Sequence, residues 1–233
     1  MTPATAFQAV KVIEARDETP TVRRVRVERP PGFEFRASQA ARLELPGGES
    51  HPFSIASGPA RPWLDFAARR SASPFKEAFF ALAPGDEVRV LGPRGRFFLD
   101  PEVPALLVAG GVGITPMRSM LEHVADAGLA LPVALVYQNR TPEEIAFRAE
   151  IDGIASARPN VAVHHVLTQP PPGWPGRAGR IDEALLAEAA AAEGARWYVA
   201  GPPAFVDRAV GAARALAVPP ERLLLEVFRG YEE

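Results

Sequence analysis

The chain has 233 residues, 47% of them hydrophobic, which suffices for one large domain or two of ordinary size. Its formal net charge of -2 excludes a general electrostatic attraction to nucleic acid or to an anionic membrane. Because the sequence has no cysteine, disulfides, thiolate catalysis and cysteine-ligated clusters are excluded, and a redox role needs a bound organic cofactor.

The beginning of the chain shows no targeting signal. A basic segment followed by a long apolar core is missing there, and no later segment has the length of a membrane span. We therefore expect a cytoplasmic protein.

Residues 7–100 consist of short apolar runs separated by turn signals rich in glycine and proline. Six runs at this spacing predict a small antiparallel β-barrel. The predicted strands are 10–13, 22–27, 41–45, 53–56, 63–67 and 88–91.

One helix interrupts these strands, at residues 73–82. Ser73 is suited to be its N-cap, and Pro74 suits the first helical position. The helix either closes one end of the barrel or offers its free N–H groups to an anion, just after Arg69 and Arg70.

After residue 101, longer strands and helices alternate, which predicts a doubly wound parallel sheet. We place a barrel domain at 1–101 and an α/β domain at 102–233, with a ligand cleft between them. Predicted strands are 105–109, 132–137, 161–167, 196–200 and 223–227; helices are 116–127, 142–151, 181–192 and 203–216, with one long loop at 168–177.

A glycine turn joins the first strand and helix of this second half. The apolar run 105–109 breaks at Gly110 and Gly111, and Thr115 and Pro116 are predicted as the N-cap and first residue of the helix. Such a turn lets a phosphate approach the backbone at the start of a helix. The full dinucleotide fingerprint is not met, because Pro116 stands where its third glycine would be.

Histidine and serine positions do not suggest hydrolysis or metal binding. His51 and Ser54 lie three apart on a predicted strand, so they point to opposite faces. His164 and His165 are adjacent on a strand and diverge, which favours structural roles.

Several short motifs in fixed order resemble the ferredoxin–NADP reductase superfamily, and they span nearly the whole chain. They are the strand at 51–57, the helix start at Ser73, the segments 85–88 and 92–97, the glycine turn 110–116, and the segments 136–140, 200–203 and 226–228. The resemblance implies a six-stranded antiparallel Greek-key β-barrel that binds FAD, followed by a doubly wound α/β domain that binds NADP(H) or NAD(H).

The resemblance also implies which residues form the site. Ser54 would approach the flavin N5 edge and Glu226 would lie beside the reacting rings, where hydride passes from nicotinamide to flavin. Flavin-binding positions would be His51, Pro52, Phe53, Ser54, Arg69, Ser71, Ala72 and Ser73. Phe228 and Tyr231, near the C-terminus, are our further candidates for cofactor binding. Positions for the nicotinamide cofactor would be Gly110, Gly111, Gly113, Ile114, Thr115, Pro116, Asn139, Arg140, Gly201 and Pro202.

Three positions depart from the family pattern. His51 replaces the arginine that meets the flavin pyrophosphate, and it cannot make a bidentate guanidinium contact, although Arg69 or Arg70 could compensate. Phe53 replaces a tyrosine and keeps only the apolar face. Ala200 replaces a cysteine before the Gly-Pro pair, so no thiol takes part in hydride transfer.

Two further expectations concern the cofactors. Tyr231 either covers the outer face of the flavin or belongs to a frayed terminus. Asn139 and Arg140 suit the 2′-phosphate of NADPH, although Glu143 and Glu144 follow closely.

The sequence thus predicts a flavin-dependent NAD(P)H oxidoreductase that passes electrons to a carrier such as ferredoxin or flavodoxin. An NAD(P)H:flavin reductase using flavin as a dissociable substrate, and an electron-transfer or regulatory subunit of a larger redox complex, stay open as alternatives. Ferric chelates, quinones and an oxygenase partner stay open as acceptors. We expect a monomer with no metal, nucleic-acid or membrane partner.

Overall fold

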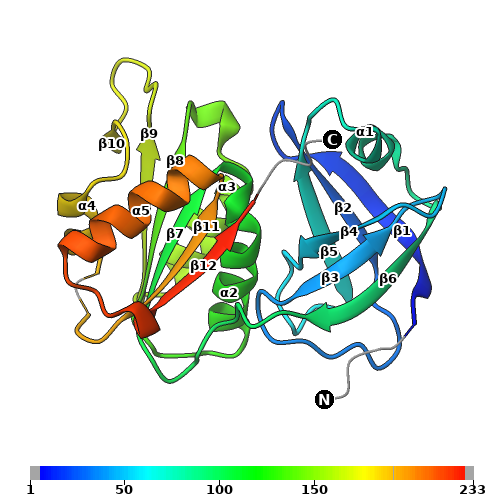
Figure 1. Cartoon of the computed structure of the whole chain (residues 1–233), viewed down its shortest axis with the longest axis horizontal. Coiled ribbons are helices and arrows are strands. Elements are labelled where there is room, and N and C mark those ends of the chain that lie inside the picture. Colours follow the sequence, from blue (N-terminus) through cyan, green and yellow to red (C-terminus); the bar gives the residue numbers. More distant parts are fainter. Residues whose placement is uncertain (1–5, 191, 229–233) are drawn as a thin grey trace.

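The computed structural model describes residues 6–190 and 192–228, and it contains two six-stranded sheets that lie side by side (Figure 1). The first sheet ends at Arg94 and the second begins at Ala105. The predicted domain boundary at residue 101 falls in the segment between them and stays a prediction.

The first sheet is antiparallel, with the strand order β4-β3-β6-β1-β2-β5. Ala56 N donates to Asp65 O at 2.8 Å, which joins the chain just after β4 to β5 and closes the sheet into a barrel. This confirms the predicted antiparallel architecture. Its strands are β1 (Gln8–Asp17), β2 (Val22–Glu28), β3 (Ala40–Glu44), β4 (Ser50–Ser54), β5 (Trp63–Arg69) and β6 (Glu87–Arg94).

Helix α1 (Pro74–Ala81) covers part of the barrel core, into which it buries Phe75 and Phe79. Ser73 is its N-cap, as predicted, and the Ser73 hydroxyl accepts a hydrogen bond from Lys76 N at 3.3 Å. Serine capping and proline at the first position are local signals, so the sequence alone was enough to locate this helix.

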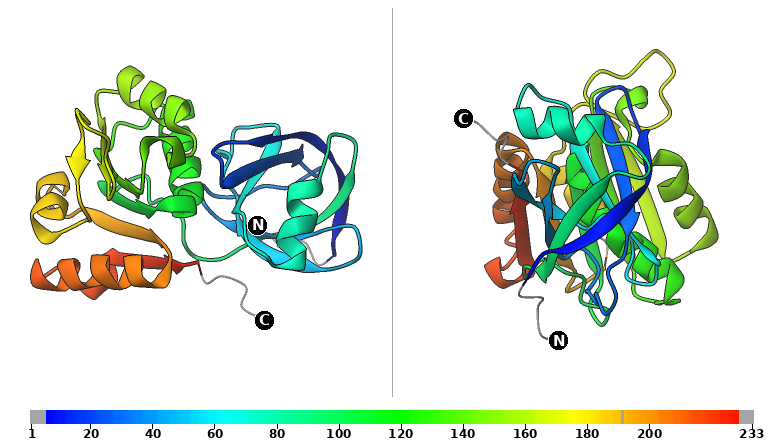
Figure 2. Two further views of the ribbon diagram at one scale, coloured as in Figure 1. Left: turned by 90° about the horizontal axis from the view of Figure 1, so that it is seen from above. Right: turned by 90° about the vertical axis from the view of Figure 1, so that its right-hand side faces the viewer.

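The second sheet is parallel, with the order β10-β9-β8-β7-β11-β12, so the chain reverses direction across the sheet between β7 and β11. Helices α2 and α3 cover one face of the sheet, and α4 and α5 cover the other (Figure 2). Leu107 belongs to the core under α2 and α3, whereas Leu106 and Val108 belong to the core under α4 and α5. Its strands are β7 (Ala105–Gly110), β8 (Val133–Asn139), β9 (Val161–Leu167), β10 (Arg177–Ala178), β11 (Arg196–Gly201) and β12 (Leu223–Val227). The helices are α2 (Ile114–Asp126), α3 (Arg148–Ala157), α4 (Glu183–Ala189) and α5 (Pro203–Ala215), with 3-10 turns η1 (Gly111–Gly113), η2 (Pro142–Glu144) and η3 (Pro220–Arg222).

Three predicted helix starts are wrong. Helix α4 begins at Glu183 rather than at residue 181, because Asp182 is its N-cap, and it ends at Ala189 rather than at residue 192. Helix α2 begins at Ile114, and Gly113 rather than Thr115 is its N-cap, because the 3-10 turn η1 runs directly into the helix. The helix predicted at 142–151 is divided into η2 and α3, since Phe147 adopts a left-handed conformation with φ of 59°. A short strand, β10, begins at Arg177, the last residue of the predicted loop, and pairs with β9.

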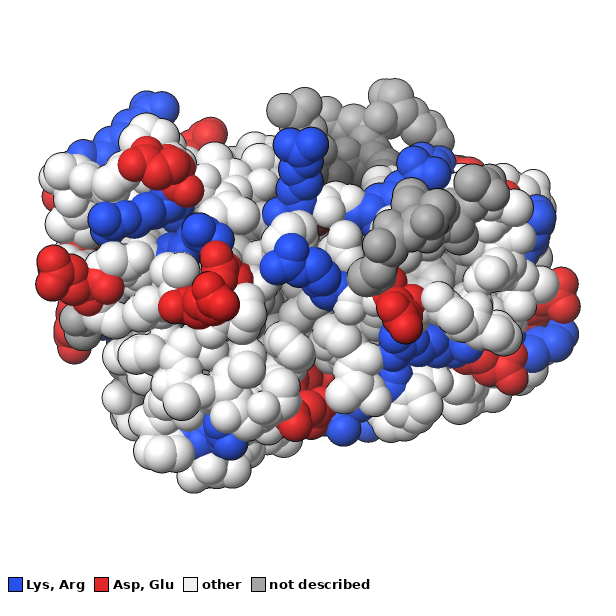
Figure 3. Space-filling model, turned by 90° about the horizontal axis from the view of Figure 1, so that it is seen from below, with Lys and Arg blue, Asp and Glu red and all other residues white. Residues whose placement is uncertain are grey.

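The described residues contain no helix with both the length and the apolar character that crossing a bilayer requires. On the face shown in Figure 3, Lys and Arg side chains are interspersed with Asp and Glu side chains. This mixture agrees with the formal net charge of -2.

Candidate functional site

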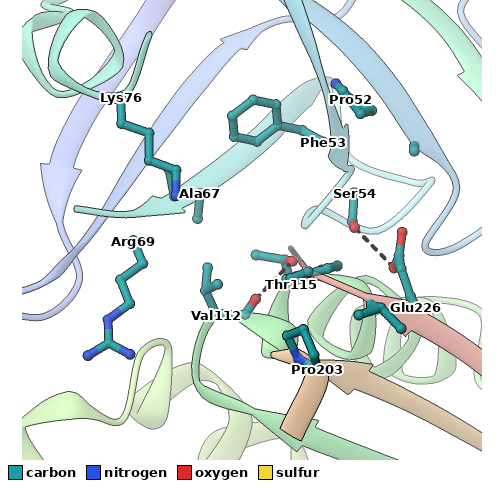
Figure 4. A pocket seen from close by; sticks show the side chains of 14 residues that line it. Pro52, Phe53, Ser54, Ala67, Arg69, Lys76, Val112, Thr115, Pro203 and Glu226 are labelled. Atoms are coloured by element: carbon teal, nitrogen blue, oxygen red, sulfur yellow. Dashed lines mark hydrogen bonds between the residues drawn. The ribbon is translucent and has the colours of Figure 1, made fainter. Parts of the chain in front are cut away.

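A cavity of about 760 Å³ lies where the barrel meets the carboxyl ends of the parallel strands (Figure 4). Its walls come from both sheets, which agrees with the general rule that α/β sheets bind ligands at this edge. The lining residues are Ala40, Pro52, Phe53, Ser54, Ala67, Ala68, Arg69, Lys76, Val112, Thr115, Pro203, Glu226, Val227 and Phe228.

A hydrogen bond spans this cavity between the two sheets. Ser54 Oγ, at the end of β4, donates to Glu226 Oε2 on β12 at 3.1 Å. Burial raises the pKa of Glu226 to about 7, and the bond from Ser54 offsets part of that rise. Glu226 can therefore hold or release a proton near neutral pH, and Ser54 fixes the orientation of its carboxyl group.

Two cations reach the cavity from the barrel side. Arg69 lies at the end of β5 and Lys76 lies in the first turn of α1 (Figure 4). Burial and the nearby charge of Arg69 lower the pKa of Lys76. Arg69 Nη2 is 3.8 Å from Glu144 Oε2 of η2, which leaves the pair open to exchange with a stronger anion. Like charges facing one cavity favour a ligand with negative charge there.

The apolar part of the same wall is built around Phe53. Its ring stacks on Phe79 of α1, with ring centroids 5.4 Å apart and an interplanar angle of 14°. Pro52, Ala67 and Ala68 continue this surface. The barrel side of the cavity thus offers a flat apolar surface next to a cationic end.

His51 is not among the residues that line the cavity. Its Nε2 is 2.8 Å from Glu49 Oε1, and its ring meets Phe75 of α1 edge-on, with ring centroids 4.3 Å apart. Lys76, which sequence reasoning missed, lines the cavity on this side instead. The signal for it was its position three residues after the N-cap Ser73, next to the predicted anion site.

The glycines around α2 have separate roles. A Cβ on Gly113 would lie 2.2 Å from Ala200 O, and one on Gly110 would lie 2.7 Å from the Phe205 ring, so both are required by packing. Gly111 has a φ of +53°, and a Cβ there would meet no atom within 4 Å beyond its chain neighbours, which leaves its backbone open to a ligand.

Thr115 serves the glycine turn in a different way from the one predicted. Its hydroxyl donates to Val112 O at 3.1 Å, which stabilises η1 from inside the helix. Both residues line the cavity. The side chain of Thr115 therefore shapes the cavity wall without capping the helix.

The cavity brings together only part of the predicted set. Pro52, Phe53, Ser54, Arg69, Thr115, Glu226 and Phe228 line it. The other described candidates do not, namely His51, Ser71, Ala72, Ser73, Gly110, Gly111, Gly113, Ile114, Pro116, Asn139, Arg140, Gly201 and Pro202. Tyr231 lies outside the described residues. The lining residues that sequence reasoning missed are Lys76 and six residues with small or apolar side chains, namely Ala40, Ala67, Ala68, Val112, Pro203 and Val227. Those six side chains carry no chemical group that would mark them as part of a site.

One of the two histidines of β9 contacts the neighbouring helix. His165 Nε2 is 2.7 Å from Asp152 Oδ1 of α3, so this side chain joins strand and helix. Across the described part of the chain, no three His, Cys, Asp or Glu side chains gather in a way that could hold a metal ion.

Comparison with known proteins agrees with this architecture. The family model described as the oxidoreductase NAD-binding domain matches residues 107–210. Ferredoxin–NADP reductase B of Sorangium cellulosum strain So ce56 is 35% identical over an alignment length of 232, and the alignment covers 93% of this chain and 93% of that one. The ferredoxin–NAD(P)(+) reductase component of the naphthalene 1,2-dioxygenase system of Pseudomonas putida is 26% identical, over 93% of this chain and 67% of that one.

Solved structures show the same fold. The cytochrome P450 reductase GcoB of Amycolatopsis superposes with a TM-score of 0.83 at 25% identity, over 97% of this chain and 71% of that one. Phthalate dioxygenase reductase superposes with a TM-score of 0.79 at 25% identity, over 98% and 70%. From the shared fold and the 35% identity over nearly the full length, the chain belongs to the ferredoxin–NADP reductase superfamily of FAD- and NAD(P)-binding oxidoreductases.

Proposed function

We propose that this protein is an FAD-dependent oxidoreductase that takes a hydride from NAD(P)H and passes the electrons to a ferredoxin-type carrier. The observation that carries the proposal is the cavity in which Ser54 of the barrel meets Glu226 of the nucleotide sheet at 3.1 Å. The relative of 35% identity is named a ferredoxin–NADP reductase, which supports the choice of acceptor. When bound, the flavin supplies the redox chemistry, since it accepts electrons in pairs and gives them up singly.

The residues of the barrel wall fit FAD. Phe53 offers an apolar face for the ring system, and Ser54 offers a hydroxyl at its polar edge. Arg69 and Lys76 supply the positive charge that a pyrophosphate needs, a role that we assign to them in preference to His51. Ser71, Ala72 and Ser73 would add backbone N–H groups from the segment before α1.

Ser54 and Glu226 are the proposed catalytic residues. With a pKa of about 7, the Glu226 carboxyl can hold a proton at Oε1, the oxygen that does not accept from Ser54, and exchange it with the reacting groups. Ser54 keeps this carboxyl directed into the cavity. The apolar walls around them exclude water from the space where hydride transfer would occur.

On the other wall, we propose that the nicotinamide cofactor binds along the glycine turn. The open backbone at Gly111 lets a pyrophosphate approach the start of α2. Gly201 and Pro202, at the end of β11, would lie beside the nicotinamide. Asn139 is buried at the end of β8 and Arg140 is exposed directly after it, which suits the 2′-phosphate of NADPH. Arg140→Ala is expected to reduce the preference for NADPH over NADH, and an unchanged ratio would exclude this role.

A second candidate function is an NAD(P)H:flavin reductase that releases its flavin. It is favoured by one observation, that His51 contacts Glu49 and Phe75 and does not line the cavity. A weaker hold on the phosphate end would let the flavin dissociate. We further propose that the protein acts as a monomer in the cytoplasm, which size-exclusion chromatography and cell fractionation test.

The visible spectrum of the purified protein after desalting is the first experiment. Stoichiometric yellow flavin, together with NAD(P)H-dependent reduction of a ferredoxin, supports the main proposal. A colourless protein whose NAD(P)H oxidation depends on added flavin supports the flavin reductase. If the protein neither binds flavin nor oxidises NAD(P)H, both are wrong.

A further inference from the structure

Helix α2, which starts at the cavity, carries polar side chains on the face that meets the barrel. Arg118, Ser119 and Glu122 lie one to two turns after the cavity residue Thr115, and their exposed fractions are only 2%, 0% and 6%. Burying charged side chains at a contact between two sheets is costly unless every donor and acceptor is paired. The hydrogen-bond and ion-pair partners of these three side chains therefore indicate the role of the contact between α2 and the barrel.

Arg118 bonds to both halves of the molecule. On the barrel side, its Nη1 donates to Ala56 O at 2.9 Å and to Asp65 Oδ2 at 3.1 Å. On the nucleotide side, its Nε and Nη2 pair with Glu150 and Glu122, each at 2.7 Å. One planar guanidinium thus fixes two oxygen atoms of the barrel relative to two carboxylates on helices α2 and α3.

Asp65 of β5 is the barrel partner of Arg118, and its exposed fraction is 0%. Burial alone would raise its pKa, but a hydrogen bond from Arg26 and the charges of Arg118 and Arg24 outweigh burial and hold the pKa below its usual range. Asp65 is therefore ionised at neutral pH, and the contact with Arg118 is a charged one.

Two further side chains of α2 bind the barrel in parallel with Arg118. The Ser119 hydroxyl donates to Ser57 O at 2.7 Å and accepts from Ser38 N at 2.9 Å. Glu122 Oε2 accepts from Gly58 N at 2.7 Å. Both side chains hold backbone atoms of the barrel, so they resist sliding of one sheet against the other.

The barrel ends of these bonds lie close to the cavity in sequence. Ala56 follows the cavity residue Ser54 by two residues, and Asp65 and Ser38 precede the cavity residues Ala67 and Ala40 by two each. Asp65 and Ala67 both lie on β5, where residues two apart share a face, so a shift at one displaces the other directly. Ser38 lies in the turn before β3, and Ala56 lies just after β4. These three barrel segments of the cavity wall are thus tied to α2.

We propose that Arg118 is a positioning residue, which holds the barrel and the nucleotide sheet at the separation at which Ser54 meets Glu226. The role rests on the proposed function, because that separation matters only if reaction takes place between the two walls. Directional bonds suit the task better than apolar contact, since apolar surfaces can slide while a guanidinium fork cannot. A small displacement of reacting groups is enough to slow a reaction by about 100-fold.

The test compares Arg118→Lys and Ser119→Ala in the full-length chain loaded with flavin. Lysine keeps the charge but loses the fork, and Ser119→Ala removes a second tie without leaving an unpaired charge. We expect the rate of flavin reduction at saturating NAD(P)H, measured by stopped flow, to fall by about 10-fold to 100-fold in Arg118→Lys and less in Ser119→Ala. KM for NAD(P)H should change little in both.

A second measurement works without flavin. Carbon-13 NMR of labelled glutamate side chains, with Glu226 assigned by its loss in Glu226→Gln, gives the pKa of Glu226 in the flavin-free chain. If Arg118 and Ser119 set the separation of the walls, both variants let water in and return this pKa toward its ordinary value. Arg89→Met is the control, because the Arg89–Glu44 ion pair, at 2.7 Å, joins two strands of the barrel and does not involve the α/β domain.

The results separate this inference from the proposed function. If the wild-type chain fails to bind flavin, the proposed function is wrong, while the NMR measurement still decides whether Arg118 sets the separation. The inference is overturned if both variants lose thermal stability but keep the wild-type pKa of Glu226. Where flavin binds, it is also overturned if both variants keep the wild-type rate of flavin reduction. In either case, Arg118 has a purely structural role.

Discussion

Two of the helices that begin at the cavity, α1 and α2, start in different ways. Helix α1 is capped by a side chain, the hydroxyl of Ser73, and places Lys76 in its first turn. Helix α2 has no side-chain cap, and its first residue, Ile114, donates its N–H to Gly111 O of the preceding 3-10 turn. The start of α1 therefore depends on side-chain groups, whereas the start of α2 depends on the conformation of the backbone before it.

This difference determines how each start responds to mutation. At α1, the attraction for an anion comes from Lys76 and Arg69, so a point substitution can reduce it and leave the fold intact. At α2, the turn depends on the absence of side chains at glycines that press against β11 and α5, so a substitution there disturbs the fold itself. The predictions below test this contrast.

The largest effect is expected for Gly113→Ala. Its Cβ would lie 2.2 Å from Ala200 O and 2.8 Å from Gly201 N, both backbone atoms that cannot move aside. We expect the free energy of unfolding, measured by urea denaturation, to fall by about 3 kcal/mol or more. Gly111→Ala is the control, because its cost is limited to a positive φ, roughly 1 kcal/mol. Equal losses in the two variants would contradict the packing role of Gly113.

The next effect concerns Glu226, whose raised pKa reports its burial in the cavity wall. Since its pKa is about 7 when folded and 4.5 ordinarily, the folded state keeps a proton that the unfolded state loses between these values. Stability should therefore fall as pH rises from about 4.5 to about 7, by on the order of 3 kcal/mol.

Urea denaturation across this pH range, compared with Glu226→Gln, isolates the contribution of Glu226. The difference between the two proteins should change with pH only inside the window. Ser54→Ala is the complementary variant, and it should raise the pKa of Glu226 further because a bond to the ionised form is lost. A difference that stays constant from pH 4 to pH 8 would show that Glu226 is solvated.

Removal of the cations at the α1 side should weaken flavin binding without unfolding the protein. Lys76→Met and Arg69→Met are each expected to raise the flavin Kd by about 10-fold, since each removes one charge-assisted contact worth ~1.5 kcal/mol. Fluorescence titration with FAD measures this. Lys11→Met serves as the control, because Lys11 pairs with Glu87 on the barrel exterior. Unchanged affinity in both variants would exclude these cations as the phosphate partners.

The smallest effect is expected for Ser73→Ala, which removes the cap of α1. Loss of an N-cap costs about 1 kcal/mol, and α1 is held by the burial of Phe75 and Phe79 as well. A thermal melt should show a drop of a few degrees with flavin affinity nearly unchanged. Ser71→Ala, two residues earlier and outside the cap, should leave the melting temperature as it is.

Local rules predicted what depends on neighbours in the chain. The start of α1 follows from Ser73 and Pro74, and the parallel strands follow from continuous apolar runs such as 105–109. The start of α2 could not be found this way, because Gly113 is required by contact with β11, about 90 residues later in the chain. The division of the helix at Phe147 likewise depends on a left-handed residue that no local pattern indicates.

In the candidate site, too, the features that depend on contacts between distant parts of the chain could not be predicted from the sequence. Ser54 and Glu226 were found through a resemblance of motifs, and the structure places them in contact. Ala67 and Ala68 were missed, because an alanine becomes part of a wall only once the barrel has closed. The partnership of Arg118 with Asp65 was also beyond the sequence, since each is one charged residue among many until the two sheets meet.

The Ser54–Glu226 bond joins residues 172 positions apart, so the site has a very high contact order. Closing so long a loop is unfavourable until the sheets that bracket it have formed. On refolding, secondary structure should return before the cavity does, and flavin capture should be the last event. Far-ultraviolet circular dichroism would follow the return of secondary structure, and quenching of flavin fluorescence would follow cofactor binding. The time at which flavin binds would then report when folding of the whole chain is complete.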